Sequence, residues 1–301
     1  MSQYSLKIKA HYVGPVKENI VEVYSKFIIP VGLDETNLVL FQGNLKPGKE
    51  GDLILKDLSS NYRTKTVIVF QVEDYEGKYS YYENILLFRS SRHQKYTNTN
   101  EFTLPYPWAE SIEAFPPIES MPKLKIGFCG QFGKNLNHRM RMLLYFKLSK
   151  NVEADYILRT KFWGIDYHNN KEVRKEYVDS FEKHAFILSP RGAGNFSMRH
   201  YESMNFGRIP VVINTDMILP FSSVIDWQET IVFEKGPKRC IKKMKQILSS
   251  GSLVDYQLKS KKIYDEYLSY DNFFKKVIEL ILIPRAIISN SEDVIRVDSF
   301  S

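Results

Sequence analysis

Short runs of apolar and β-branched residues recur between turn residues in the first part of the chain. They span residues 6–13, 37–42, 52–58, 66–72 and 84–89. Several runs, such as TVIVFQV, are continuously apolar, which is typical of strands buried on both faces of a largely parallel sheet. Helical periodicity is weak here, and we predict a helix only over residues 18–28.

Apolar runs and amphipathic stretches alternate regularly in the rest of the chain. A segment rich in proline and aromatic residues, LPYPWAESIEAFPPIESMPK, comes first and cannot continue a helix or a central strand. We therefore place a domain boundary near residue 119. Beyond it the pattern predicts strands over 124–129, 155–160, 185–189, 209–214 and 230–234, and helices over 138–149, 171–184, 197–206 and 237–249.

This alternation of strands and helices indicates βαβ units and a doubly wound, parallel sheet. A helical stretch over residues 252–282 follows, and the tail over 288–301 is expected to be frayed or loosely docked. With 301 residues the chain is long enough for two domains. The predicted fold class is α/β, with an N-terminal domain over residues 1–118 and a C-terminal domain over 119–301.

Charge and cysteine content narrow the class of partner only slightly. The net charge of +7 favours anionic partners in general, such as phosphates, membrane surfaces or acidic sugars. A short cationic cluster at residues 238–245 is expected to be the solvated face of a helix and not a nucleic-acid surface. Two cysteines are too few for a disulfide framework, and no apolar run has the length of a membrane helix or the form of a signal peptide. We expect a cytoplasmic protein with at most peripheral membrane contact.

The most informative segment is AFILSPRGAGNFSMRHYESMNFGRIPVV, residues 185–212. A buried strand runs into a loop that contains Gly192 and Gly194, and a helix starts near Ser197. At the carboxyl end of a parallel strand, such a loop and helix start present backbone N–H groups to an anion. The spacing therefore predicts a pyrophosphate-binding position.

Arg199 and Glu202 lie three residues apart, on nearly the same face of that predicted helix. A cation in the first turn opposes the helix dipole unless an anion compensates it, so Arg199 favours a bound phosphate. Glu202 is placed to accept hydrogen bonds from ribose hydroxyls and is not required by the core. The alternative interpretation is an ordinary Arg–Glu surface pair beside glycines that merely turn the chain.

The whole segment resembles the exostosin family of glycosyltransferases. The shared features follow in the family's order: a strand ending in Pro-Arg-Gly (186–192), Ser-x-Arg at Ser197 and Arg199, a glutamate three residues later, Gly-x-Ile-Pro-Val-Val (207–212), Leu-Pro-Phe (219–221) and Asp226-Trp227. The upstream segment IGFCGQFGKNLNHRMRMLL resembles the family element that opens the same domain. The resemblance is specific over about residues 121–235, and the N-terminal part matches only in its rhythm of strands.

The resemblance implies a GT-B-like architecture of two facing Rossmann-like domains. The C-terminal domain would bind the nucleotide-sugar donor, and the acceptor would approach from the N-terminal domain. It implies that Arg191, Ser197 and Arg199 hold the diphosphate, that Glu202 binds the ribose, and that Arg139 is a further phosphate ligand.

Two departures from the family pattern bear on the type of enzyme. Arg208 stands where the family usually has a cysteine, and we expect the chain to lack the membrane anchor of the family's Golgi members. Both departures fit a bacterial or viral type without a membrane anchor. The tryptophan at Trp227 resembles a structural residue of the family.

Sugar transfer also requires a neutralised diphosphate and, for inversion, a general base. Arginines and a helix dipole neutralise a diphosphate without metal, and no Asp-x-Asp pair is present, so no metal and no other cofactor is expected. Asp74, directly after the predicted strand 66–72, is the first candidate base, and Glu73 is the second. The alternative for both is that they are turn residues before a glycine.

Other residues are weaker candidates for contact with donor or acceptor. Asp166 and His168 follow the predicted strand 155–160, and Trp108 and Trp163 lie in loops where an indole ring can stack on a sugar.

The predicted function is a glycosyltransferase that moves a sugar from a nucleotide-diphosphate sugar, with UDP favoured, to a glycan acceptor by a metal-independent, inverting reaction. A non-catalytic glycan- or nucleotide-binding protein on the same fold is the alternative. A nucleic-acid-binding protein is disfavoured because its expected motifs are absent. The sequence leaves the oligomeric state open.

Overall fold

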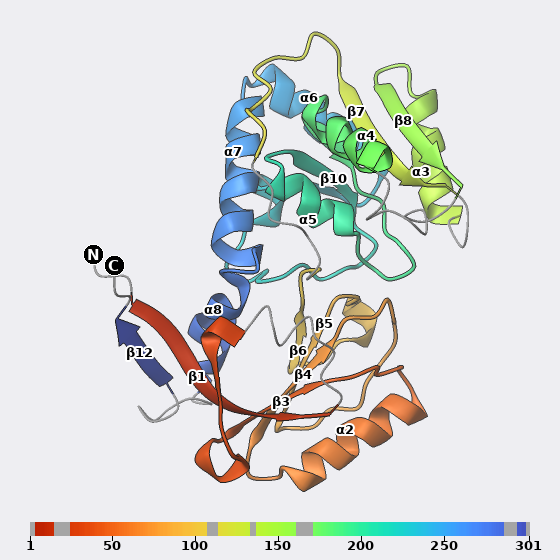
Figure 1. Ribbon diagram of the computed structural model, residues 1–301. Helices are drawn as coiled ribbons and strands as arrows, with labels where there is room; N and C mark the ends of the chain where they lie inside the picture. The colour runs from red at the N-terminus through yellow and green to blue at the C-terminus, as the bar shows by residue number, and fades with distance from the viewer. Residues whose placement is uncertain are drawn as a thin grey trace. The chain divides into compact units, whose positions relative to one another are not determined.

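The computed structural model describes residues 4–14, 25–106, 114–132, 137–160, 171–285 and 294–298. The chain divides into two compact units (Figure 1). The first unit consists of Met1–Pro107 and Glu266–Ser301, and the second of Trp108–Asp265.

A seven-stranded sheet forms the first unit. Its strands are β1 (Tyr4–Val13), β2 (Ile28–Pro30), β3 (Leu38–Gln42), β4 (Thr66–Gln71), β5 (Ile85–Arg89), β6 (Glu101–Thr103) and β12 (Val294–Asp298). The strand order is β12-β1-β3-β4-β5-β6, with β2 beside β1. β12 runs antiparallel to β1 and the other pairings are parallel, which confirms the expected largely parallel sheet.

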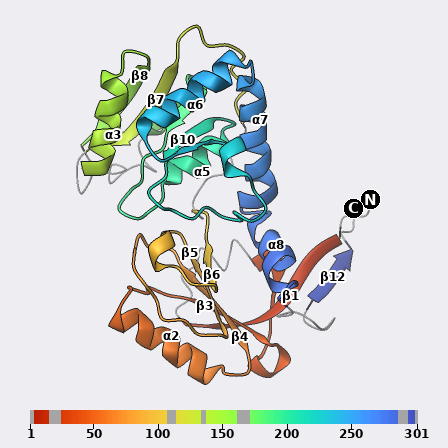
Figure 2. The same ribbon diagram turned by 180° about the vertical axis from the view of Figure 1, so that it is seen from behind.

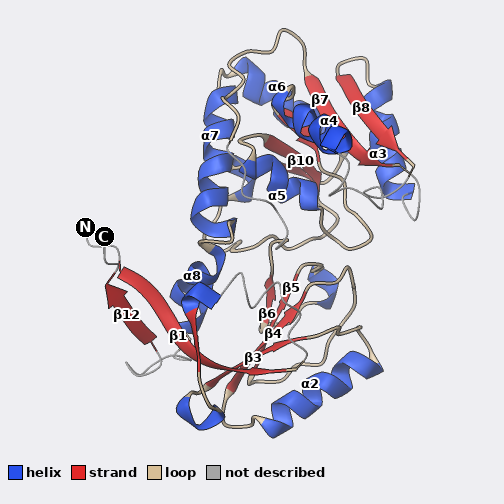
Figure 3. Ribbon diagram, in the orientation of Figure 1, coloured by secondary structure: helices blue, strands red, loops and turns tan. Residues whose placement is uncertain are grey.

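Helices cover both faces of this sheet (Figure 3). On one face α2 (Lys49–Asn61) buries Leu55 and Leu58 against apolar side chains of β3, β4 and β5. On the other face α8 (Phe273–Val277) places the rings of Phe273 and Phe274 near those of β5 and β4, at centroid distances of 6.4 and 6.3 Å. A π-helical segment, Ile278–Leu282, continues α8. Short 3₁₀ turns lie at Ser25–Phe27, Leu33–Glu35 and Gln94–Tyr96.

Two predictions for the first unit are wrong. Residues 52–58, expected as a strand, belong to helix α2, whose buried residues Gly51, Leu55 and Leu58 recur at helical spacing while Leu53 is 50% exposed. The tail expected to be frayed or loosely docked contains β12, which pairs with β1 from Val294 to Asp298. The predicted helix over 18–28 lies mostly outside the described residues, and its last residue begins β2.

A five-stranded parallel sheet forms the second unit. Its strands are β7 (Lys125–Gln131), β8 (Glu153–Arg159), β9 (Phe186–Leu188), β10 (Ile209–Ile213) and β11 (Val232–Glu234), in the order β11-β10-β9-β7-β8. Its helices are α3 (Asn137–Leu148), α4 (Lys171–Glu182), α5 (Met198–Asn205), α6 (Pro237–Ser249) and α7 (Leu253–Ile263). The strands and helices predicted over residues 124–249 are therefore confirmed, with ends shifted by a few residues.

The two faces of this second sheet carry different helices. α3 and α6 bury apolar side chains on one face, where they form a single core with β7, β9, β10 and β11 (Figure 2). On the opposite face α4 packs Tyr177 and Phe181 against Ile187 of β9 and Phe206 at the end of α5. The second unit is thus doubly wound, as predicted. A 3₁₀ turn, Trp227–Glu229, precedes β11, and a π-helical segment, Tyr264–Leu268, follows α7.

The division into units differs at both ends from the predicted domains 1–118 and 119–301. Phe115 already packs in the second unit, since its ring stacks on that of Phe206 at 5.4 Å and its backbone N–H donates to the Phe206 carbonyl. From Glu266 onward the chain belongs to the first unit, where α8 covers the sheet. An amphipathic pattern shows that a helix has an apolar face, but it does not say which sheet that face will cover.

Candidate functional site

The glycine loop after β9 is held rigidly by hydrogen bonds within the second unit. The backbone N–H of Gly192 donates to the Phe196 carbonyl at 2.8 Å. The buried side chain of Asn195 accepts from Thr215 Oγ1 at 2.5 Å and from Arg191 Nη1 at 3.3 Å. Gly194 is buried, and the loop leads into α5, whose N-cap is Ser197. The hydroxyl of Ser197 does not cap the helix, so the first N–H groups of α5 receive no side-chain oxygen from it.

Arg199 links the first turn of α5 to the carboxyl end of β7. Its Nη2 donates to the Cys129 carbonyl at 2.5 Å, and its guanidinium lies 4.4 Å from the centre of the Phe128 ring. This approach requires the glycine at position 130, because a Cβ there would lie 2.3 Å from Nη2. Arg199 is half-buried, and its buried Nε has no hydrogen-bond partner within the described ranges.

Arg139, at the start of α3, joins Arg199 at the same place. It donates to the carbonyls of Gln131, at 3.1 Å, and Arg191, at 3.2 Å, and thereby ties the end of β7 to the glycine loop. Burial, with a smaller contribution from the charge of Arg199, lowers the pKa of Arg139 to about 10. Burial also lowers the pKa of Arg191. Neither Arg139 nor Arg199 forms an ion pair with a carboxylate in the part of the chain that the structure describes.

The predicted phosphate ligands are therefore brought together. Arg139, Arg191 and Arg199 surround the carboxyl ends of β7 and β9, which are neighbouring strands, beside the N-terminus of α5. Close cations repel each other in a partly desolvated site, so a bound anion would relieve an unfavourable electrostatic energy. Backbone N–H groups and a helix dipole add to the attraction for negative charge. This arrangement, called the arginine cluster below, suits a phosphate or diphosphate.

Glu202 is placed differently from the expectation. It is buried, with 7% of its surface exposed, and the hydroxyl of Tyr177 from α4 donates to its Oε2 at 2.5 Å. Burial, followed by the charge of Glu202, holds the pKa of Tyr177 far above its usual range. The expectation that Glu202 need not join the core is wrong, because one carboxylate oxygen already serves to bind α5 to α4.

This contact changes what the substitution Glu202→Gln is expected to do. Replacing the charged acceptor by an amide weakens the bond from Tyr177, so the free energy of unfolding should fall by about 1 kcal/mol. Nucleotide affinity should fall as well if Glu202 also accepts from ribose hydroxyls. Thermal melting and titration calorimetry measure the two effects separately, and Tyr177→Phe is the matched control that removes the hydroxyl donating to Glu202. A lower melting temperature with wild-type nucleotide affinity in Glu202→Gln would remove Glu202 from the ribose role.

Gly130 offers a way to move Arg199 without removing its charge. A Cβ at position 130 collides with the end of the flexible guanidinium, so Gly130→Ala should displace Arg199, and the positive φ of +159° there adds backbone strain that lowers stability. Nucleotide affinity is expected to fall at least about tenfold, because a charge-assisted hydrogen bond is lost when its donor is displaced. Calorimetric titration of the variant with UDP measures this effect. Gly48→Ala is the matched control, since φ is also positive there (+103°) and nothing lies within 4 Å of a Cβ, so it adds backbone strain without displacing a side chain. Wild-type affinity in Gly130→Ala would argue against a role for the present position of Arg199.

Asp74 and Glu73 lie in the first unit, in the loop that follows β4 at the carboxyl edge of its sheet. Asp74 is exposed at the surface, but surrounding chain partly desolvates its carboxyl and raises the pKa above the usual aspartate value. Glu73 is half-buried, and its Oε2 accepts from Gln71 Nε2 at 3.3 Å. The buried Arg89 donates to the Tyr75 carbonyl at 2.9 Å and fixes the same loop. A raised pKa in a fixed loop is consistent with the predicted base.

Several other candidates lie outside the described residues or play a structural part. Trp108, Trp163, Asp166 and His168 are outside the described ranges. Trp227 is buried and its Nε1 donates to the Pro220 carbonyl at 2.9 Å, which agrees with a structural role.

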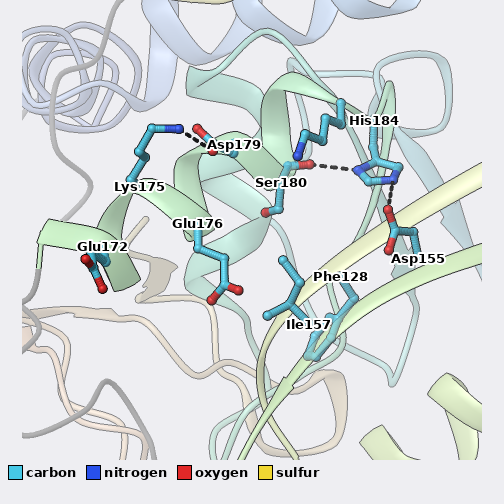
Figure 4. Close-up of a pocket in the computed structure, with 10 residues that line it drawn as sticks. Phe128, Asp155, Ile157, Glu172, Lys175, Glu176, Asp179, Ser180 and His184 are labelled. Carbon is cyan, nitrogen blue, oxygen red and sulfur yellow. Dashed lines mark hydrogen bonds and ion pairs between the residues drawn. The ribbon is translucent and has the colours of Figure 1, made fainter.

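A hollow of about 390 Å³ in the second unit lies between α4 and the strands β7 and β8 (Figure 4). His184 connects α4 to β8 at the edge of this hollow: its Nδ1 lies 2.9 Å from the Ser180 carbonyl and its Nε2 lies 3.1 Å from Asp155 Oδ2. Four carboxylates line the hollow: Asp155, Glu172, Glu176 and Asp179. With only two lysines in the lining, it repels a diphosphate and is not the predicted donor site.

Sequence reasoning missed Tyr177 and Gly130 as parts of the site. Tyr177 lies in the predicted helix over 171–184, and nothing in the pattern of that helix shows that its hydroxyl will meet Glu202. Gly130 follows the predicted strand 124–129, and a glycine at a strand end is a signal of close approach that could have singled it out.

The fold of the second unit defines a class of protein, the doubly wound α/β proteins, in which ligands bind at the carboxyl ends of the strands. The sequence matches the Exostosin GT47 domain over residues 70–250. The chain belongs to the exostosin GT47 family of glycosyltransferases.

Curated relatives match over part of their length. The probable glucuronosyltransferase GUT1 of Oryza sativa subsp. japonica is 32% identical over 99 residues, which are 30% of this chain and 24% of that protein. The Exostosin-1 homolog of Caenorhabditis elegans is 33% identical over 101 residues, 33% of this chain and 26% of that protein. This chain thus spans about a quarter of the relatives' length. The crystal structure of TarM aligns with a TM-score of 0.45 at 12% identity, over 87% of this chain and 57% of that chain.

Helices in the described ranges are too short or too polar to cross a membrane.

Proposed function

We propose that the protein is a glycosyltransferase that transfers a sugar from a nucleotide-diphosphate sugar to a glycan acceptor. The observation that carries this proposal is the arginine cluster, in which three arginines from α3, the glycine loop and α5 meet at the ends of β7 and β9. UDP is the favoured nucleotide, by resemblance to the family. The cytoplasmic setting and the bacterial or viral type also stay predictions.

The arginine cluster can promote sugar transfer by stabilising the negative charge that develops on the leaving group. As the bond between the sugar and the diphosphate breaks, negative charge builds on the leaving diphosphate, and fixed cations stabilise that charge most at the transition state. Arg199 and Arg139 would supply these fixed positive charges without a metal ion. Their guanidinium groups are already oriented by the carbonyls of Cys129, Gln131 and Arg191, so little reorganisation accompanies the reaction.

Inversion at the sugar requires a base that removes a proton from the acceptor hydroxyl. Asp74 fits this role better than Glu73. Its carboxyl has a raised pKa and is exposed to an incoming hydroxyl, whereas Glu73 is occupied by Gln71.

A non-catalytic nucleotide- or glycan-binding protein is the second candidate. It is favoured by one observation, that Glu202 is engaged by Tyr177 inside the structure. If Glu202 serves only the fold, the site retains the phosphate ligands but holds the rest of the donor less firmly.

A thermal-shift screen with UDP-, GDP- and CMP-sugars, followed by assays of donor hydrolysis and transfer, tests the proposal. A ligand at a hundred times its dissociation constant stabilises the fold by about 2.7 kcal/mol, so the donor should raise the melting temperature clearly. Stabilisation by a UDP-sugar with release of UDP supports the transferase. Stabilisation without any turnover supports the non-catalytic candidate, and no stabilisation by any nucleotide sugar contradicts both.

A further inference from the structure

The outer face of α3 is apolar. The helix buries Met142, Leu143 and Phe146 in the core of the second unit. On its other side four large apolar residues remain exposed: Met140 (38%), Leu144 (50%), Tyr145 (42%) and Leu148 (77%). Residues 140, 144 and 148 follow each other at intervals of four, so they form one stripe along the helix. Single exposed apolar residues are ordinary, but a contiguous stripe marks a surface that contacts another molecule or a membrane.

The neighbouring helix α6 adds positive charge beside this stripe. α6 contacts α3 and lies on the same face of the sheet (Figure 2). It buries Cys240, Ile241, Met244 and Ile247, and its cations Lys238, Arg239, Lys242 and Lys245 are exposed. Lys243 pairs with Glu229 at 3.0 Å, but the four exposed cations have no carboxylate partner among the described residues.

The absence of acidic residues makes this surface unusual for a solvated helix pair. Neither α3 nor α6 contains an aspartate or glutamate. Exposed helices normally mix charges of both signs, which stabilise each other at intervals of three and four residues. Arg141 and Lys147 extend the positive charge onto the edges of the apolar stripe of α3.

We propose that the outer faces of α3 and α6 form a surface that binds an anionic lipid membrane. The free energy of the system falls when exposed leucines enter the boundary between headgroups and acyl chains. Lysines beside them are attracted to anionic headgroups. A nucleic acid or an acidic polysaccharide would pair with the charges of the lysines, but it would leave the leucines exposed to water. Arg139 of the arginine cluster lies in the first turn of α3, so membrane binding brings that cluster close to the lipid surface.

Sedimentation of the full chain with lipid vesicles tests this inference. The wild type is expected to bind vesicles of phosphatidylcholine with phosphatidylglycerol at least about tenfold more tightly than vesicles of phosphatidylcholine alone. The double substitution Leu144→Ser with Leu148→Ser should weaken binding by at least about tenfold. The triple substitution Lys238→Gln, Lys242→Gln and Lys245→Gln should weaken it by roughly a hundredfold.

Matched controls lie on α2 and just before it, in the first unit. Leu53→Ser removes a leucine that is also 50% exposed, and Lys46→Gln with Lys49→Gln and Lys56→Gln removes three exposed charges. Both controls should bind the anionic vesicles like the wild type, and all variants should keep the wild-type melting temperature. A wild type that fails to bind anionic vesicles would overturn the proposal. Full binding by the leucine variant beside loss in the lysine variant would also overturn it, because that pattern indicates attraction to any polyanion.

Discussion

Asp74→Asn is expected to lower the turnover of sugar transfer at least about a hundredfold, the usual scale for the loss of a general base. The amide keeps the shape of the side chain but accepts no proton at neutral pH. Because Asp74 is exposed, nucleotide affinity and melting temperature should stay close to the wild-type values. Initial rates at saturating donor, with calorimetry of UDP binding in parallel, measure these quantities.

The pH dependence gives a second readout of the same role. A base works only when deprotonated, so kcat/KM should fall as the pH drops through the pKa of Asp74. Partial burial raises that pKa, and the acidic limb should therefore lie at a higher pH than an ordinary aspartate would give. Glu73→Gln is the matched control. Unchanged turnover in Asp74→Asn, or a larger loss in Glu73→Gln, would exclude Asp74 as the base.

Arg208→Met is expected to destabilise the second unit by more than about 3 kcal/mol, because several buried acceptors lose their donor at once. Arg208 is 1% exposed and donates to five oxygens: the carbonyls of Phe181, Glu182, Pro116 and Gly207, and Gln257 Oε1. Two of these carbonyls end α4, where a cation also interacts favourably with the helix dipole. Burial lowers the pKa of Arg208 to about 10, still far above neutral pH, so the side chain stays charged.

Denaturant unfolding followed by circular dichroism measures this effect, and a loss of that size corresponds to a fall in melting temperature of roughly 6–12 °C. Arg239→Met, on the exposed face of α6, removes an arginine without buried partners and is the control. Equal stability of Arg208→Met and the wild type would show that the five acceptors find other donors. The departure of this position from the family's usual cysteine thus has a structural consequence that the motif did not indicate.

The fold of the second unit could be predicted because its strands and helices differ clearly in the period of their apolar residues. Phe186–Leu188 is apolar throughout, and α6 shows Cys240, Ile241, Met244 and Ile247 on one side. The run 52–58 was ambiguous, because LILKDL satisfies a strand and a helix almost equally. Only packing against β3 and β4 decides that Leu55 and Leu58 face inward together.

Long-range partners explain what the sequence did not predict. β12 is a strand because β1 offers it an edge, and the two are separated by nearly the whole chain. The bond between Tyr177 and Glu202 joins residues 25 positions apart on two helices. By contrast, Arg191 and Arg199 could be predicted as neighbours of one anion, because the loop and helix that carry them are adjacent in the sequence. Arg139 was expected there only by resemblance to the family.

Titration calorimetry of UDP with the wild type and Arg199→Ala tests most directly whether the arginine cluster is the donor site. Loss of a charge-assisted contact to the diphosphate costs roughly 1.5–3 kcal/mol, so the dissociation constant should rise about tenfold to a hundredfold. Arg63→Ala, which removes an exposed arginine of the first unit, should bind UDP like the wild type. Equal affinity of Arg199→Ala and the wild type for UDP would contradict the account and move the donor site elsewhere.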